Sequence, residues 1–186
     1  MAESLLVITT WERFPPADAA TVTTAVFGLA DGSTFKDLKV ATRLTLFKIV
    51  DSLFRRFPEA LIRDVGIKSR VSGLVSMAEL EKNPSCLSVL FSLYAHLSRD
   101  WDLEDEELKK TWDSFIRYFP VSIGTAKQDP SVPTKEEIRS LLLQCILSND
   151  YYAKEAIPRC IDMLDTSSDL SADTKVFSLI SFLQQR

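Results

Sequence analysis

The sequence predicts an all-α protein built from stacked helix pairs. Along most of the chain, apolar residues recur at steps of three and four, the spacing that places side chains on one face of a helix. Only five glycines occur, and none of them forms a glycine-rich phosphate-binding motif. The period-two alternation and turn dipeptides of β-strands are missing. These observations favour helices throughout the chain.

The composition suits one hydrophobic core or a short stack of helical repeats, because 46% of the 186 residues are hydrophobic. The 22 basic and 26 acidic residues give a net charge of -4, so no overall positive field attracts phosphate backbones or anionic lipid. No run approaches the roughly 20 apolar residues of a membrane span, and no signal peptide is recognisable. We therefore expect no membrane partner, no direct nucleic-acid partner, and a cytoplasmic and nuclear location.

Residues 1–36 are predicted to form divergent N-terminal helices, and the first strong helical pattern covers residues 37–57. Its apolar residues form two adjacent stripes, which suits a helix packed between neighbours. One stripe comprises Val40, Leu44, Phe47, Val50, Phe54 and Phe57, and the other comprises Leu46, Ile49 and Leu53. Pro58 is expected to end this helix.

The next pattern predicts one longer, more polar helix over residues 59–81, with Gly66 and Gly73 as candidate bends or breaks. Its exposed side is predicted to carry several basic residues. With the end of the preceding helix, the basic set is Arg55, Arg56, Arg63, Lys68 and Arg70. Acidic residues are interleaved with this set, which favours a solvated face over a nucleic-acid surface.

Two further helices are predicted before the helical pattern is interrupted at residue 119. Asn83 and Pro84 form a helix start, an N-cap acceptor followed by proline at the first helical position, and an apolar helix follows over residues 87–97. A helix over residues 102–119 begins with four carboxylates at 104–107, interpreted as a solvated start that complements the helix dipole. Its buried face is predicted to comprise Leu108, Trp112, Phe115, Ile116 and Phe119.

Residues 119–133 interrupt the helical pattern with three prolines and one glycine. Fifteen residues of helix span about 22 Å, whereas an extended segment of that length reaches about 50 Å. The segment is therefore predicted to be a crossover loop, anchored by alternating apolar side chains. A long ordered loop can also face a partner protein. Its candidate partner-binding residues are Phe119, Pro120, Val121, Ile123, Asp129 and Pro130.

Residues 134–186 are predicted to return to helix. Thr134 and Glu137 have the spacing of a capping box, and the helix after them turns an apolar face inward. A helix over residues 151–164 contains Pro158, which is expected to kink it. The last predicted helix covers residues 172–185 and packs Val176, Leu179, Ile180 and Leu183.

Cysteine and histidine usage argues against a catalytic or cluster-binding site. Cys86, Cys145 and Cys160 are far apart, contain no CxxC pair and lie in apolar helical patterns, so we expect buried reduced thiols. His96 is the only histidine and lies in an apolar helix, where a structural role is expected. The sequence therefore predicts no enzyme, no metal site and no cofactor.

Helix pairs recurring at intervals of roughly 40 to 50 residues indicate a HEAT-type α-solenoid of about three to four helix pairs with one long proline-containing crossover loop. The clearest repeat is IPRCIDMLDTSSDLSADTKVFSLISFLQ, in which a short turn joins two amphipathic helices. The predicted organisation is one helical-repeat domain over 1–186. It comprises divergent helices at 1–36, helix pairs at 37–118, the crossover loop at 119–133 and HEAT-like helices at 134–186.

Three stretches resemble one known family: LTLFKIVDSLF, VSGLVSMAELEKNPSCLSVLFSLYAHL and YFPVSIGTAKQDPSVPTKEEIRSLLLQCI. They are similar to the amino-terminal HEAT domain of the methyl methanesulfonate sensitivity DNA-repair and transcription scaffold, the large subunit of the cytosolic iron–sulfur targeting complex. The loop matches as well as the helices, including Asp129-Pro130. The loop also departs from the family pattern at Gly124 to Lys127 and at 131–133, where family members have a richer proline run.

The resemblance implies a segment of a larger, non-enzymatic scaffold. Such a segment would help present apoprotein clients, such as helicases and polymerases of DNA repair, replication and transcription, to the iron–sulfur targeting complex. The complex subunits would be contacted through the full-length scaffold. The sequence leaves open another HEAT-type adaptor, such as a transport receptor or a phosphatase scaffold, and a weak nucleic-acid-binding solenoid.

Overall fold

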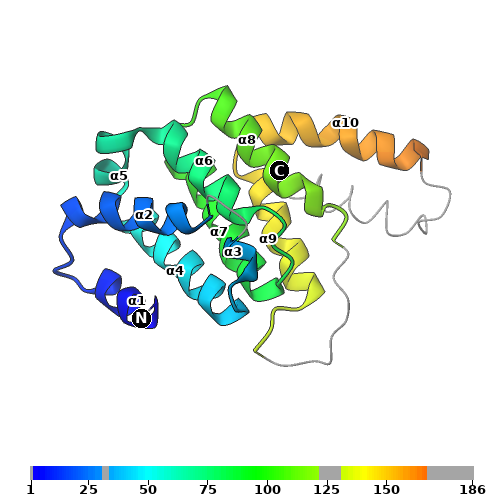
Figure 1. The fold of residues 1–186 in the computed structure, drawn as a ribbon. Helices are drawn as coiled ribbons and strands as arrows, with labels where there is room; N and C mark the ends of the chain where they lie inside the picture. Colours follow the sequence, from blue (N-terminus) through cyan, green and yellow to red (C-terminus); the bar gives the residue numbers. More distant parts are fainter. Residues whose placement is uncertain (1, 31–33, 122–130, 167–186) are drawn as a thin grey trace.

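The computed structural model describes residues 2–30, 34–121 and 131–166 (Figure 1). Within these ranges the chain forms α-helices and one short 3-10 helix without a β-strand, which confirms the all-α prediction. The helices are α1 (Ala2–Thr10), α2 (Pro16–Ala30), α3 (Thr34–Asp37), α4 (Val40–Arg56), α5 (Pro58–Val65), α6 (Ile67–Ala78), α7 (Pro84–Asp100), α8 (Asp105–Phe115), η1 (Ile116–Tyr118), α9 (Lys135–Leu147) and α10 (Asp150–Thr166).

The helices lie in two rows (Figure 1). In the first row α1 packs on α4, α4 on α7 and α7 on α9. In the second row α2 packs on α5 and α6, α6 on α8 and α8 on α10. The chain passes from one row to the other as it goes from α4 to α5, from α7 to α8 and from α9 to α10, and these pairs also touch. The described part of the chain is therefore a two-layer stack of helix pairs.

α4 and α7 run in the same direction, and so do α6 and α8. In the first row, Arg43 near the start of α4 binds Glu81 just before α7, and Phe54 near the end of α4 stacks on Trp101 just after α7 with ring centroids 5.0 Å apart. In the second row, Lys68 near the start of α6 lies 3.3 Å from Glu106 near the start of α8. These contacts make α4 and α7 parallel neighbours in the first row, and α6 and α8 parallel neighbours in the second.

The core lies between the two rows. Both predicted apolar stripes of α4 reach it, since Leu46, Phe47, Ile49, Val50, Leu53 and Phe54 are all buried. Val40 is an exception, with 41% of its surface exposed, because it is the first residue of its helix. The middle of α7 is buried on nearly all sides, as its apolar sequence predicts.

The prediction of one helix over residues 59–81 is wrong, because two helices, α5 and α6, cover this segment. They meet at Gly66, one of the two candidate breaks, whose φ of 78° lies in the left-handed region that favours glycine. This break changes which side of the following helix faces the core. A prediction that treats residues 59–81 as one continuous helix therefore assigns side chains after residue 66 to the wrong face.

Arg70 is the clearest case of this misplacement. The sequence predicts an exposed side chain, but only 1% of its surface is accessible. Its Nε donates a hydrogen bond to the Leu61 carbonyl at 3.1 Å, and its Nη1 donates to Thr24 Oγ1 at 3.0 Å. Arg70 therefore ties α6 to α5 and α2 and does not belong to a surface patch.

Both predicted helix caps are confirmed. The Asn83 side-chain oxygen accepts hydrogen bonds from the amides of Ser85 at 3.0 Å and Cys86 at 3.4 Å. Thr134 and Glu137 form the reciprocal capping box, with distances of 2.7 and 3.2 Å. The helices after these caps start and end within a few residues of the predicted positions. The predicted helix over 172–185 lies outside the described residues.

The described cysteines are buried free thiols, as predicted for Cys86 and Cys145. Burial raises the pKa of the Cys86 thiol to about 12, and it also raises the pKa of Cys145. Cys145 donates a hydrogen bond to the Phe91 carbonyl at 2.9 Å, which links α9 to α7. The side chain of Cys160 lies outside the description.

Gly73 allows a close approach between α6 and α2. A Cβ atom added at this position would lie 2.2 Å from the nearest atom of the Phe27 ring. We expect Gly73→Ala to lower the free energy of unfolding by about 1–3 kcal/mol, because displacing the ring outweighs the helix propensity gained. Urea denaturation measures this change. Gly28→Ala is the matched control, since its Cβ would meet nothing within 4 Å, and an equal loss there would contradict the steric explanation.

A buried polar cluster joins α10 to α7 and α8. The Tyr152 hydroxyl bonds to Ser98 Oγ at 2.7 Å and also to Thr111 Oγ1. The Tyr152 ring packs on Phe115 with centroids 5.1 Å apart and on Trp112 with centroids 6.0 Å apart. Burial raises the pKa of Tyr152 to about 12, so the phenol stays protonated. This cluster fixes the last described helix pair on the one before it.

Candidate protein-interaction site

Several connections between helices meet at one edge of the stack, and we define the loop edge as residues 79–83, 119–121 and 131–134. Tyr118, directly before the predicted crossover loop, donates a hydrogen bond to the Glu81 carbonyl at 2.8 Å and to the Ala78 carbonyl at 3.4 Å. Its ring packs on Phe91 of α7, with centroids 5.5 Å apart. The loop therefore leaves the second row directly beside the connection between α6 and α7.

That connection contains an unusual turn. The Glu81 amide donates a hydrogen bond to the Ala78 carbonyl at 3.2 Å, and the two central residues are Glu79 at φ -60°, ψ 126° and Leu80 at φ 62°. These angles define a type II turn, whose third position normally requires glycine or asparagine. A leucine there costs about 1–2 kcal/mol of backbone strain.

Burial does not compensate this strain, because 60% of the Leu80 surface is exposed. Leu80 is therefore unfavourable in two respects, as a left-handed leucine and as an exposed aliphatic side chain. Such a residue persists only where the surrounding structure holds it, and positions of this kind concentrate at functional sites. Leu80 is the most prominent apolar feature of the loop edge.

The carboxylate of Glu81 holds the turn in place. It is buried and accepts hydrogen bonds from Arg43, with Nε at 2.8 Å and Nη2 at 3.1 Å. It also accepts from the backbone amides of Lys82 at 3.0 Å and Asn83 at 2.9 Å. Burial alone would raise the pKa of Glu81, but the Arg43 hydrogen bond and the two amides outweigh burial and lower it. The same contact raises the pKa of Arg43.

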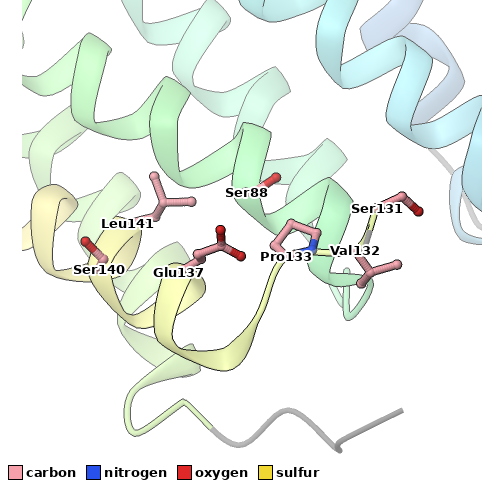
Figure 2. Close-up of a pocket in the computed structure, with 7 residues that line it drawn as sticks. All are labelled: Ser88, Ser131, Val132, Pro133, Glu137, Ser140 and Leu141. Carbon is pink, nitrogen blue, oxygen red and sulfur yellow. The ribbon is translucent and has the colours of Figure 1, made fainter. Parts of the chain in front are cut away.

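A groove of about 450 Å³ lies at the other end of the loop. Figure 2 shows it where the first turns of α7 and α9 meet residues 131–133. Its lining is mixed: three serine hydroxyls, one carboxylate and three apolar side chains. The lining residues are Ser88, Ser131, Val132, Pro133, Glu137, Ser140 and Leu141. Val132 is the exposed apolar residue on its rim, with 37% of its surface accessible.

Three of the six predicted partner-binding residues lie within the described ranges, and they differ in exposure. Phe119 is half-buried against the core, Pro120 is exposed and Val121 is buried. Ile123, Asp129 and Pro130 lie outside the described residues. The described flanks of the loop both lie near the N-terminal half of α7, at Tyr118 and at the groove beside Ser88. On the described flanks the exposed residues are Pro120 on one side and Ser131 and Val132 on the other.

Sequence reasoning missed Leu80 and the Arg43–Glu81 pair. The turn segment AELEKN contains no glycine or proline at its centre, and its asparagine serves as the next N-cap. Arg43 and Glu81 are 38 positions apart, so no local spacing rule connects them. The one signal that could have found the turn was the interruption of the apolar pattern between residues 78 and 84.

The acidic helix start was only partly predicted. Glu104 and Glu106 are exposed beside Lys68, whereas Glu107 is buried with 1% of its surface accessible. The interpretation of 104–107 as a fully solvated run is therefore wrong for Glu107. The reason is helical position, since Glu107 lies one turn before Thr111 and two turns before Phe115, on the face that packs inward.

His96, a candidate that the sequence assigned a structural role, contacts a carboxylate of its own helix. His96 Nδ1 lies 2.6 Å from Asp100 Oδ2, a hydrogen-bond distance within one helix. Among the described residues, no three or more histidine, cysteine, aspartate or glutamate side chains come together in a way that could hold a metal ion. Within the same ranges, no helix is long and apolar enough to cross a membrane.

The structure thus defines an all-α protein of stacked helix pairs, with the exposed aliphatic side chains of Leu80 and Val132 at its loop edge. Over residues 1–184 the sequence matches the family described as Dos2-interacting transcription regulator of RNA-Pol-II, the MMS19 amino-terminal family. The chain belongs to this family.

Two relatives support the assignment. The chain is 27% identical over 124 residues to the "MMS19 nucleotide excision repair protein" of Drosophila melanogaster, a match covering 67% of this chain and 13% of that protein. It is 23% identical over 153 residues to the MMS19 "DNA repair/transcription protein" of Saccharomyces cerevisiae, covering 78% of this chain and 14% of that protein. The chain therefore spans about one seventh of the length of these relatives.

Proposed function

We propose that the chain is a segment of a HEAT-type α-solenoid scaffold without enzymatic activity, which presents apoprotein clients to the cytosolic iron–sulfur targeting complex. The clients are enzymes of DNA repair, replication and transcription, and the segment works in the cytoplasm and nucleus. Family membership and the names of the relatives support the repair and transcription context. The two rows of stacked helices, in which α4 runs parallel to α7 and α6 parallel to α8, support a solenoid.

The observation that carries this proposal is Leu80. A strained turn holds an aliphatic side chain in solvent, and Tyr118 and Glu81 fix the turn from both sides. A rigid exposed side chain loses little conformational entropy when a partner covers it. The loop edge therefore has the properties expected of a surface that docks another protein.

Leu80→Asn tests this role. Asparagine adopts the left-handed conformation more readily than leucine, so the variant should be more stable by about 1 kcal/mol in urea denaturation. It should also bind a purified apo form of an iron–sulfur helicase about tenfold more weakly, measured by biolayer interferometry on the full-length scaffold.

Ile157→Asn is the matched control. Ile157 is an exposed aliphatic residue of α10, with 46% of its surface accessible, and it lies away from the loop edge. Its replacement should leave helicase binding unchanged. Loss of stability in Leu80→Asn would contradict the backbone strain assigned to Leu80, and equal helicase binding by both variants and the unaltered scaffold would contradict docking through it. Unchanged iron content of clients in cells lacking the scaffold would contradict the function itself.

A further inference from the structure

The edge of the stack opposite the loop edge contains a second groove, which we call the arginine groove. It has a volume of about 600 Å³ and lies where α4 ends and where α2 and α5 begin. Three arginines and one glutamate line it, and the other lining residues are apolar. The lining residues are Pro16, Ala17, Arg55, Arg56, Phe57, Pro58, Glu59, Ala60 and Arg63.

Arg56 places a fixed positive charge in this groove. Its guanidinium donates hydrogen bonds to the Thr9 carbonyl and, at 2.7 Å, to the Trp11 carbonyl. It lies 4.9 Å from the centroid of the Phe57 ring. These partners orient the guanidinium but carry no net charge, so they do not neutralise it. Arg56 is therefore a pre-organised cation.

The other charged residues leave the groove positive. Arg55 is already paired, since its Nε lies 2.8 Å from Asp51 Oδ1. Arg63 is exposed and forms no ion pair with a side chain that the structure describes. Glu59 supplies one negative charge against Arg56 and Arg63. The groove thus combines an excess of one positive charge with an apolar lining.

We propose that the arginine groove binds an acidic segment of a partner protein that also carries an apolar side chain. Guanidinium groups bind carboxylates through paired charge-assisted hydrogen bonds, and Arg63 and Arg56 are the residues with charge to offer. Phe57, Pro58 and Ala60 provide contacts for the apolar side chain. This site is independent of the loop edge, so failure of either proposal leaves the other standing.

A peptide fits the observations better than a nucleic acid. Binding to a phosphate backbone draws its affinity from several cations that neutralise successive phosphates. Here the five basic residues named in the sequence analysis are dispersed: Arg70 is buried, Lys68 pairs with the acidic start of α8, and Arg55 pairs with Asp51. The remaining two arginines suit one or two carboxylates.

Fluorescence anisotropy with the 186-residue chain tests the proposal. The probes are a fluorescein-labelled peptide of alternating glutamate and phenylalanine, the same peptide with lysine in place of glutamate, and a labelled single-stranded oligonucleotide. The acidic peptide should bind, and added salt should weaken the binding. Arg63→Glu should weaken it about tenfold, because the charge reversal repels the carboxylates.

Arg139→Glu is the matched control, because Arg139 is an exposed arginine of α9 outside the groove. It should leave peptide affinity within about twofold of the unaltered chain. Equal weakening by both variants, no binding of the acidic peptide, or equal binding of the lysine peptide would overturn the proposal. Tighter binding of the oligonucleotide, lost in Arg63→Glu, would also overturn it and would assign the groove to nucleic acid.

Discussion

Arg43→Ala is expected to lower the free energy of unfolding by about 3–5 kcal/mol, because it leaves the buried Glu81 carboxylate without its cation. Arg43 supplies two of the four hydrogen bonds that Glu81 accepts, and the Glu81 side chain is only 2% exposed. Urea denaturation monitored by circular dichroism measures the loss.

The loss should depend on pH in a defined direction. In the native chain the pKa of Glu81 lies below its ordinary value of 4.5, so its contribution to stability is complete above that value and declines as pH falls through the lowered pKa. Without Arg43, burial favours the protonated acid. The stability deficit of Arg43→Ala should therefore be largest near neutral pH and should shrink as pH falls, first through the raised pKa of Glu81 in the variant and then through its lowered pKa in the native chain.

An exposed ion pair provides the comparison. Arg55→Ala removes the partner of Asp51, and the two side chains are 36% and 26% exposed. Its expected cost is about 0–1 kcal/mol, because solvent screens the pair. A deficit for Arg43→Ala as small as that for Arg55→Ala would contradict the assigned role of the Glu81 pair.

Tyr152→Ala is expected to cost about 3–5 kcal/mol. Tyr152 is fully buried, packs on Trp112 and Phe115, and bonds to Ser98 and Thr111. Removing its ring creates a cavity and leaves two buried hydroxyls short of one partner. Thermal unfolding followed by calorimetry measures the change.

Tyr152→Phe separates the ring from its hydroxyl. This variant keeps the packing and loses the two hydrogen bonds, so its expected cost is about 1–3 kcal/mol. If Tyr152→Phe were as damaging as Tyr152→Ala, the ring contacts would contribute nothing measurable. If both variants were as stable as the native chain, the cluster would not hold α10 in place.

The parts of the fold that sequence predicts best are those governed by local chemistry. The two stripes of α4, the Asn83 cap and the Thr134 capping box depend on residues within one or two turns, and all of them are confirmed except for Val40 at the start of one stripe, which is exposed. The predictions of exposure for Arg70 and Glu107 were wrong, because the burial of these side chains depends on how each helix is rotated against its neighbours. The break at Gly66 sets that rotation for α6, and periodicity assigned to one long helix could not follow it.

The candidate site was less predictable than the helices. The proline content marked 119–133 as a loop, but proline content does not indicate which side chains face solvent. Leu80 adopts a conformation that its residue type disfavours, and long-range contacts from Arg43 and Tyr118 impose it. The sequence analysis named the arginines of the second groove. Only the structure shows that Arg56 and Arg63 line this groove, whereas Lys68 and Arg70 do not.

The nearest-neighbour packing within each row affects how the stack melts. The main contacts of each helix in a row join it to the helix before and the helix after, so cooperativity passes from pair to pair. Arg43–Glu81 and the Tyr152 cluster are couplings between successive pairs. Weakening one coupling should divide a single melting transition into two, with the segments on either side unfolding at separate temperatures.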